Sequence, residues 1–164
     1  MTINTLKDVY IDQMQDMHSA CKQSAEVTKE LIDAASNPDL KQALKDGVKG
    51  IEDGIEVLAK LIRAHDADPE GAHCKGMEGL VTEARAHGIE ADFGDRDAQD
   101  AMIITQYQRM AHYAIAGYGC CKAFAKRLGF DDQVKDLDTC LDACYDGDNR
   151  FTDLAEDKIN KKAA

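Results

Sequence analysis

Apolar residues recur at every third or fourth position through four long stretches of this chain, approximately 3–35, 38–65, 97–128 and 132–158. This spacing matches the turn of an α-helix and gives each stretch one apolar face. A shorter stretch at 72–86 has the same pattern. None of these stretches shows the strict alternation that a half-buried strand requires. The periodicity therefore predicts an all-α protein.

Helix breaks separate these stretches. Asn37 and Pro38 are typical of an N-cap followed by a first turn, and Gly129 is typical of a helix C-cap. Pro69 lies in a polar stretch, and 87–97 is a further predicted break. The connection between the second and third long helices, roughly 30 residues, is long enough to cross a bundle and make them parallel. We predict a ferritin-like four-helix bundle with a minor crossover helix.

Length and charge limit the classes of protein to consider. With 164 residues and 18.0 kDa, the chain is expected to form a single domain, 1–164. A net charge of -11 argues against nucleic acid and against an anionic membrane surface as partners. The N-terminus lacks the pattern of a secretion signal, and no apolar run is long enough to span a bilayer. We expect a cytoplasmic protein that forms a homodimer or a higher homo-oligomer.

Four long helices of similar length bring their midpoints to one depth in a bundle. The residues predicted at that depth are Cys21, Ile51, Ala111 with His112, and Cys144. Ferritin-like bundles build a two-metal site at this level from Glu and Glu-x-x-His side chains. Here the apolar faces place a single acid, Asp148, inward near this layer.

Several motifs recur in order along the chain: "LKDVYIDQMQDMHSACKQ", "SNPDLKQAL", "CKGMEGL" (74–80), "RDAQDAMI" with "AHYAIAGYG", and "FTDLAEDKINKKA". Together they make nearly the whole chain resemble the YciE/YciF-type ferritin-like stress proteins. The resemblance implies a ferritin-like fold and a stress-associated role.

The chain departs from that family where the resemblance implies metal-binding acids. The family's acids fall on Cys21, on Lys49 and Gly50, and on Asp142, Ala143 and Cys144, while its Glu-His-Tyr-Glu motif is reduced to His112 and Tyr113 between Ala111 and Ala114. A di-iron or di-manganese centre is therefore not expected. Oxidase and catalase chemistry is not expected either, and we predict no catalytic residues.

Cysteine takes the place of some of those acids. We expect the six cysteines to be reduced, because no secretion signal accompanies them and none forms a CxxC pair. Cys21 and Cys144, with His112 and with Cys140 one turn away, would suit Cu(I) or Zn(II). A redox-active dithiol is the other form of this cysteine-based centre. The alternative is that buried Cys acts as a small apolar side chain.

A second hypothesis rests on small residues in the middle of the bundle. Gly47, Gly50 and Gly54 are predicted to face Ala111, Ala114 and Tyr118 across the interior. Glycine inside a helix costs about 1 kcal/mol relative to alanine, so this cluster suggests close helix contact or room for a small molecule or cofactor. A purely structural oligomeric bundle is the third hypothesis, and the cysteine-based centre is the leading one.

Overall fold

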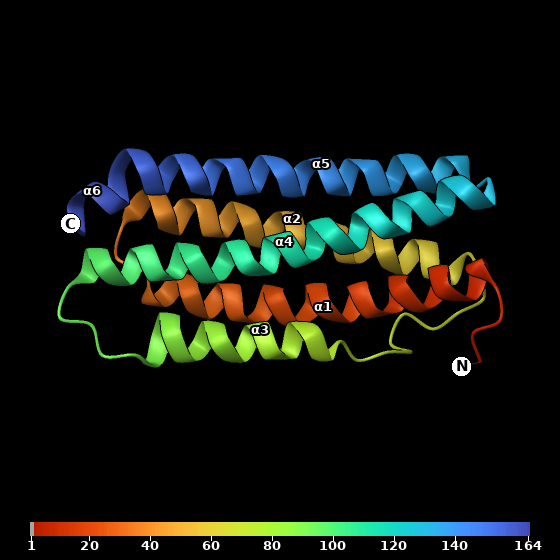
Figure 1. The fold of residues 1–164 in the computed structure, drawn as a ribbon, viewed down its shortest axis with the longest axis horizontal. Helices are drawn as coiled ribbons and strands as arrows, with labels where there is room; N and C mark the ends of the chain where they lie inside the picture. Colours follow the sequence, from red (N-terminus) through yellow and green to blue (C-terminus); the bar gives the residue numbers. More distant parts are fainter. Residues whose placement is uncertain (1) are drawn as a thin grey trace.

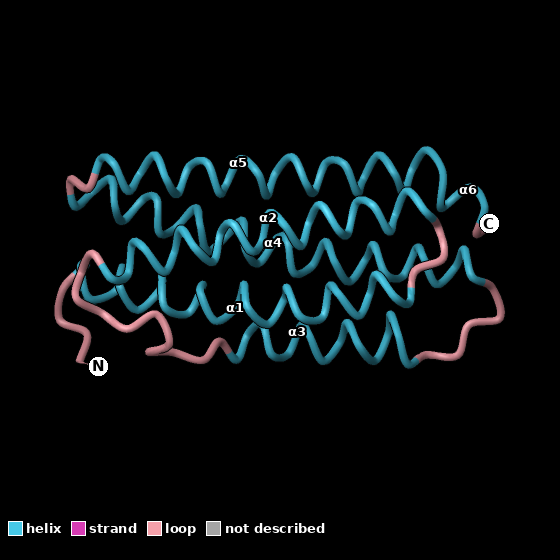
Figure 2. Tube along the Cα trace, turned by 180° about the vertical axis from the view of Figure 1, so that it is seen from behind, coloured by secondary structure: helices cyan, strands magenta, loops and turns pink. Residues whose placement is uncertain are grey.

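The computed structural model describes residues 2–164 and contains helices and loops, with no strand in that range (Figure 2). The elements are α1 (Leu6–Ala34), α2 (Pro38–Arg63), α3 (Lys75–Arg85), the π-helical turn η1 (Ala86–Glu90), α4 (Arg96–Leu128), α5 (Asp131–Leu154), the π-helical turn η2 (Ala155–Ile159) and α6 (Asn160–Lys162). The predicted bundle of four long helices with a minor crossover helix is confirmed.

The long helices form two hairpins, α1 with α2 and α4 with α5. Helix α1 also contacts α4, and α2 contacts α5, so the four helices close into a ring around a shared interior. Figure 1 shows α2 and α4 running in the same direction, as the long crossover predicts. Helix α3 lies outside the ring against α1 and α4.

Local sequence signals set several helix ends. The Asn37 side chain accepts the backbone N–H of Asp39 at 2.9 Å, and Pro38 begins α2, where a missing N–H costs no helical hydrogen bond. Gly129 ends α4 in the left-handed conformation, with φ of 78°. Both ends lie where the sequence predicts them.

One predicted break is wrong in part, because 87–90 continue the helix as the η1 turn and the loop begins at Ala91. Tertiary contacts hold this extra turn. Gly88 is buried against α1, and its carbonyl accepts a hydrogen bond from the side-chain amide of Gln99 at 3.1 Å. A residue at position 88 larger than glycine would meet Leu31, which explains why a helix-weakening residue stands there.

Helix α1 fixes the crossover loop. The Gln15 side chain donates to the carbonyl of Asp68 at 2.6 Å, and the backbone N–H of Cys74 donates to Ser19 Oγ at 3.0 Å. His18 lies buried between these two contacts, and its Nδ1 has no hydrogen-bond partner within residues 2–164. Burial lowers the pKa of His18, so the ring is neutral at pH 7.

Asp100 on α4 fixes the turn between α1 and α2. Its carboxylate is fully buried and accepts hydrogen bonds from the backbone N–H of Ser36 at 2.7 Å, from Ser36 Oγ at 2.6 Å and from the backbone N–H of Asn37 at 2.8 Å. The two hairpins are thereby joined at one end of the bundle.

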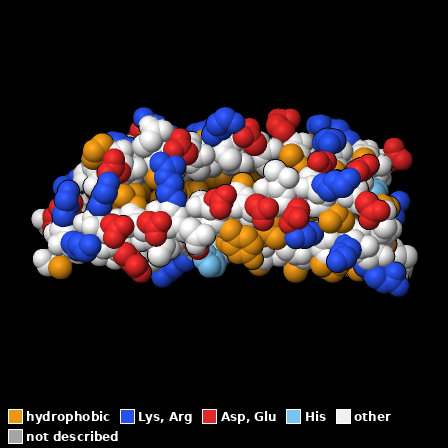
Figure 3. All heavy atoms as spheres, turned by 90° about the horizontal axis from the view of Figure 1, so that it is seen from above, with side chains coloured by type: hydrophobic (Ala, Val, Ile, Leu, Met, Phe, Trp, Pro, Cys, Tyr) orange, Lys and Arg blue, Asp and Glu red, His pale blue; other side chains and the backbone are white. Residues whose placement is uncertain are grey.

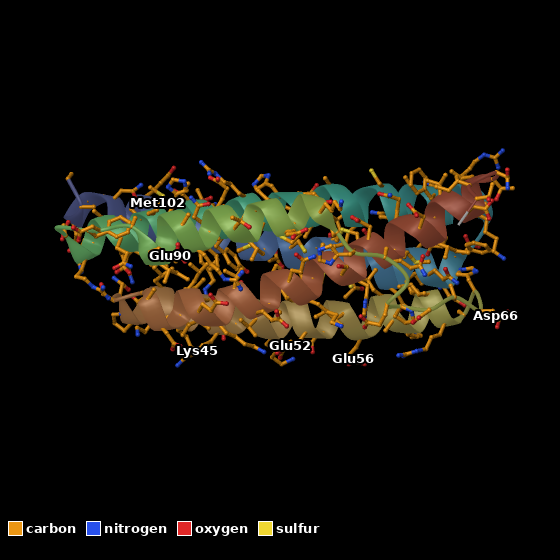
Figure 4. All side chains as sticks on the ribbon, turned by 90° about the horizontal axis from the view of Figure 1, so that it is seen from below. Lys45, Glu52, Glu56, Asp66, Glu90 and Met102 are labelled. Atoms are coloured by element: carbon orange, nitrogen blue, oxygen red, sulfur yellow. The ribbon has the colours of Figure 1, made fainter. Side chains whose placement is uncertain are left out.

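The surface of the bundle is charged. On α2, Lys45 and Glu56 point away from the other helices (Figure 4), and Glu52 pairs with Lys29 of α1 at 2.8 Å. None of the helices within residues 2–164 combines the length and apolar character that a bilayer-spanning segment needs.

Candidate functional site

Small side chains leave a cavity of about 250 Å³ in the middle of the bundle. The residues that line it are Cys21, Ser24, Thr28, Ala43, Asp46, Gly47, Gly50, Ile51, Gly54, Tyr107, Met110, Ala111, Ala114, Tyr118, Cys140, Ala143, Cys144, Asp146, Gly147, Arg150 and Phe151. The cavity divides the core: Phe151 belongs to the half at one end of the bundle and Tyr118 to the half at the other. Glycine and alanine from facing helices are too short to fill the space between these halves.

The glycines of α2 line the cavity for two different reasons. Gly47 lies against the hydroxyl of Tyr107, and Gly54 lies against the hydroxyl of Tyr118, so neither position has room for a Cβ atom. Gly50 has no such neighbour, since a Cβ there would meet no atom within 4 Å. All of the residues predicted to surround a ligand (Gly47, Gly50, Gly54, Ala111, Ala114 and Tyr118) lie in the cavity wall.

The cavity opens to solvent between α2 and α5. Its exposed lining residues belong to these two helices: Asp46 and Gly50 on α2, and Ala143, Asp146 and Arg150 on α5. Figure 3 looks onto the α5 side and shows hydrophobic side chains along a hollow with acidic and basic side chains on either side. The cavity is therefore open to solvent on this side of the bundle.

An ion pair spans this opening. Arg150 Nη1 donates to Asp46 Oδ2 at 2.6 Å, and Gln42 Nε2 donates to Asp46 Oδ1 at 2.9 Å. The hydrogen bond from Arg150 holds the pKa of the Asp46 carboxyl below its ordinary value. Because both side chains are about half exposed, with exposed fractions of 49%, the pair contributes little to stability and can separate easily.

Three free thiols lie in the wall, those of Cys21, Cys140 and Cys144. Cys21 Sγ lies 3.5 Å from the hydroxyl oxygen of Tyr118. Burial raises the pKa of the Cys21 thiol to about 12 and the pKa values of Cys140 and Cys144 to about 11. At neutral pH the thiols are protonated, so this part of the wall is uncharged.

His112 lies apart from these thiols. Its exposed side chain places Nε2 3.0 Å from Asp148 Oδ2, in the contact between α4 and α5, and neither residue lines the cavity. Asp148 also accepts a hydrogen bond from the Gln108 side chain at 3.1 Å, so this acid, expected to face inward, lies in the contact between α4 and α5 and outside the cavity wall. Within residues 2–164, no three His, Cys, Asp or Glu side chains converge so as to hold a metal ion.

Two aromatic residues of the wall, Tyr107 and Phe151, have no motif in the sequence that marks them as site residues. Tyr107 stacks on Phe151 with ring centroids 4.1 Å apart and an interplanar angle of 22°. Both lie on predicted apolar faces, but the period of a helix does not say which residues of two helices meet. The signal available in the sequence was Gly47, whose lack of a side chain leaves room for the Tyr107 ring.

Comparison with known proteins places this architecture in a family. The model of a domain of unknown function, DUF892, matches residues 5–164. Protein YciF of Escherichia coli (strain K12) is 31% identical over 164 residues, which cover 99% of this chain and 98% of YciF. The crystal structure of the E. coli stress protein YciF matches with a TM-score of 0.90 at 31% identity, over 97% of this chain and 99% of that chain. YcfI from Rhodopseudomonas palustris matches with a TM-score of 0.85 at 30% identity, over 92% of this chain and 94% of that chain. The chain therefore belongs to the DUF892 family, as a ferritin-like helical relative of YciF.

Proposed function

We propose that this protein is a stress-associated member of its family that binds a small, mainly apolar molecule in the central cavity and does not transform it. The observation that carries the proposal is the cavity of about 250 Å³, reached between α2 and α5 and walled mainly by small and apolar side chains. Unfilled apolar space loses dispersion contacts and lowers stability, so its presence here favours a binding role. The stress association rests on the description of E. coli YciF as a stress protein.

The size of the cavity limits the ligand. An apolar protein cavity of roughly 150 Å³ accepts benzene, whereas pockets for drug-sized molecules begin at roughly 300 Å³. A volume of about 250 Å³ lies between these limits and fits a single substituted ring or a short branched chain. The protonated thiols and the small side chains of the wall suit such a molecule because they impose no charge on it.

Gly50→Leu tests this proposal because it adds a side chain at a lining position of the opening where a Cβ would meet no atom within 4 Å. We expect this change to weaken the binding of a substituted benzene such as ethylbenzene at least tenfold, since the leucine takes up the space of the ligand. Ligand-observed NMR measures the affinity, and native mass spectrometry of freshly isolated wild-type protein identifies a co-purifying molecule.

Gly79→Leu is the matched control. Gly79 also lies inside a helix with no atom within 4 Å of its would-be Cβ, but it is on α3 and does not line the cavity. This variant should bind ethylbenzene as the wild type does. Equal binding by wild type and Gly50→Leu would contradict the proposal, as would a wild-type protein that carries no small molecule and binds no apolar probe.

A soft-metal centre is the second candidate, because the thiols of Cys21, Cys140 and Cys144 and the thioether of Met110 line one cavity. Sulfur ligands favour Cu(I), and binding would have to displace the protons that burial retains on the thiols. We rank this candidate below ligand binding because the side chains do not converge as a metal site does. A thiol-redox role of the same cysteines has the same rank.

Titration with Cu(I) separates the two candidates. A sulfur centre predicts about one tightly bound equivalent in the wild type and none after Cys21→Ser with Cys144→Ser. Cys120→Ser is the control, since this cysteine is exposed and outside the cavity. Elemental analysis of freshly isolated protein and a count of free thiols complete the test. The centre is ruled out if binding is not stoichiometric or survives the double substitution.

A further inference from the structure

We infer that the ligand of this cavity is a neutral molecule with one hydrogen-bond acceptor, such as a carbonyl oxygen or a ring nitrogen, which accepts from the hydroxyl of Tyr107. The inference rests on the proposed function and goes further, because it names the group that recognises the ligand and the charge that the site rejects.

Tyr107 carries a hydroxyl that is free to bind a ligand. The residue is 7% exposed and lines the cavity, and its hydroxyl lies beside Gly47, another wall residue. Stacking on Phe151 fixes the ring. This hydroxyl makes no hydrogen bond to any other part of residues 2–164. This oxygen is not enclosed by protein, since His18 Nδ1 is the one buried polar side-chain atom without a partner within residues 2–164, so the hydroxyl faces the cavity. A ligand that offers an acceptor gains a hydrogen bond there in place of water.

The other hydroxyls of the wall are already bound. Ser24 Oγ donates to the carbonyl of Cys21 at 3.0 Å, and Thr28 Oγ1 donates to the carbonyl of Ser24 at 2.6 Å. The Tyr118 hydroxyl lies 3.5 Å from Cys21 Sγ, within the range of a hydrogen bond to sulfur. Tyr107 is therefore the hydroxyl of this wall that can donate to a ligand without losing an internal partner.

The charges around the opening select against anions. Arg150 is the one basic side chain among the lining residues, and Asp46 already binds its guanidinium. Asp146 adds a second carboxylate at the rim. An anionic ligand would be repelled by these two carboxylates. It would also lose its hydration without gaining an unpaired positive charge in the wall, which is strongly unfavourable. Both lining carboxylates lie at the exposed rim, so a cation inside the cavity would have no carboxylate beside it. A neutral molecule is the ligand that this wall accommodates.

Burial also keeps the Tyr107 hydroxyl protonated. Its pKa is raised to about 12, mainly by removal from water, so at neutral pH the group donates a hydrogen bond and carries no charge.

Three probes with the same ring test the inference: acetophenone, which has an acceptor, ethylbenzene, which has none, and benzoate, which is an anion. Binding to wild-type protein and to Tyr107→Phe is followed through the methyl resonance of Met110, a wall residue. We expect Tyr107→Phe to lower the affinity for acetophenone about five- to tenfold, which is the loss typical of one hydrogen bond. The affinity for ethylbenzene should change less than about twofold. Benzoate should bind at least tenfold more weakly than acetophenone.

Tyr113→Phe is the matched control, because it also removes one tyrosine hydroxyl from α4, but one that contacts Cys74 and Asp16 outside the cavity. The affinity of this variant for acetophenone should lie within about twofold of the wild-type affinity. The inference is overturned if Tyr107→Phe leaves the affinity for acetophenone unchanged, or if benzoate binds the wild type as tightly as acetophenone does. In either case the cavity remains a binding site. If neither neutral probe binds the wild type, the proposed function fails as well.

Discussion

Replacing Asp100 with alanine should lower the free energy of unfolding by about 3–5 kcal/mol, because it leaves three hydrogen-bond donors, one of them on the buried Asn37, without their acceptor. The carboxylate accepts the backbone N–H groups of Ser36 and Asn37 and the hydroxyl of Ser36, all at 2.8 Å or less. Asp100 is fully buried, so water does not readily replace it. Urea unfolding followed by circular dichroism measures the change.

Two further variants define what Asp100 does. The free energy of unfolding of Asp100→Asn should lie between those of the wild type and Asp100→Ala. The amide oxygen of asparagine still accepts a hydrogen bond, but its NH₂ group faces other donors. Asp142→Ala is the control for loss of an aspartate from a long helix, because Asp142 is exposed on α5, and it should change stability by less than about 0.5 kcal/mol. A loss below about 1 kcal/mol for Asp100→Ala would show that this contact does not hold the hairpins together.

The sequence predicts the helices well because their signals are local. The apolar period, the capping residues and glycine each act within a few residues of the chain. This is why α2 begins after Asn37 and α4 ends at Gly129, as expected. The role of Asp100 depends on partners 63 and 64 positions away. The motif "RDAQDAMI" could therefore be matched to a family, but its function in anchoring the turn could not be read from it.

The candidate site shows the same limit. Small residues on facing helices predicted where a cavity could lie, whereas the ion pair between Asp46 and Arg150 joins residues 104 positions apart. His112 is adjacent in sequence to the cavity residue Ala111, and one position on a helix turns a side chain by roughly 100°. That rotation carries His112 to the surface beside Asp148. Ligand binding and self-association both stay predictions.

Gly54→Ala should destabilise the protein by about 1–2 kcal/mol, although alanine is the better helix former by about 1 kcal/mol. The added Cβ would lie 2.5 Å from the hydroxyl oxygen of Tyr118, closer than real Cβ atoms come. Tyr118 is 2% exposed, and displacing its hydroxyl to make room for the Cβ would break the contact with Cys21.

The sign of this effect should reverse in the Tyr118→Phe background. Without the oxygen, the nearest ring atom is Cζ at 3.7 Å, which is ordinary van der Waals contact, so the helix preference of alanine remains and Gly54→Ala should stabilise by up to about 1 kcal/mol. Gly50→Ala, which meets no atom within 4 Å, should stabilise by a similar amount in both backgrounds. Urea unfolding of the four proteins in the cycle gives the coupling between Gly54 and Tyr118, expected at about 1–3 kcal/mol. Equal effects of Gly54→Ala in the two backgrounds would mean that this glycine does not make room for the Tyr118 hydroxyl, and that the small residues of α2 need another explanation.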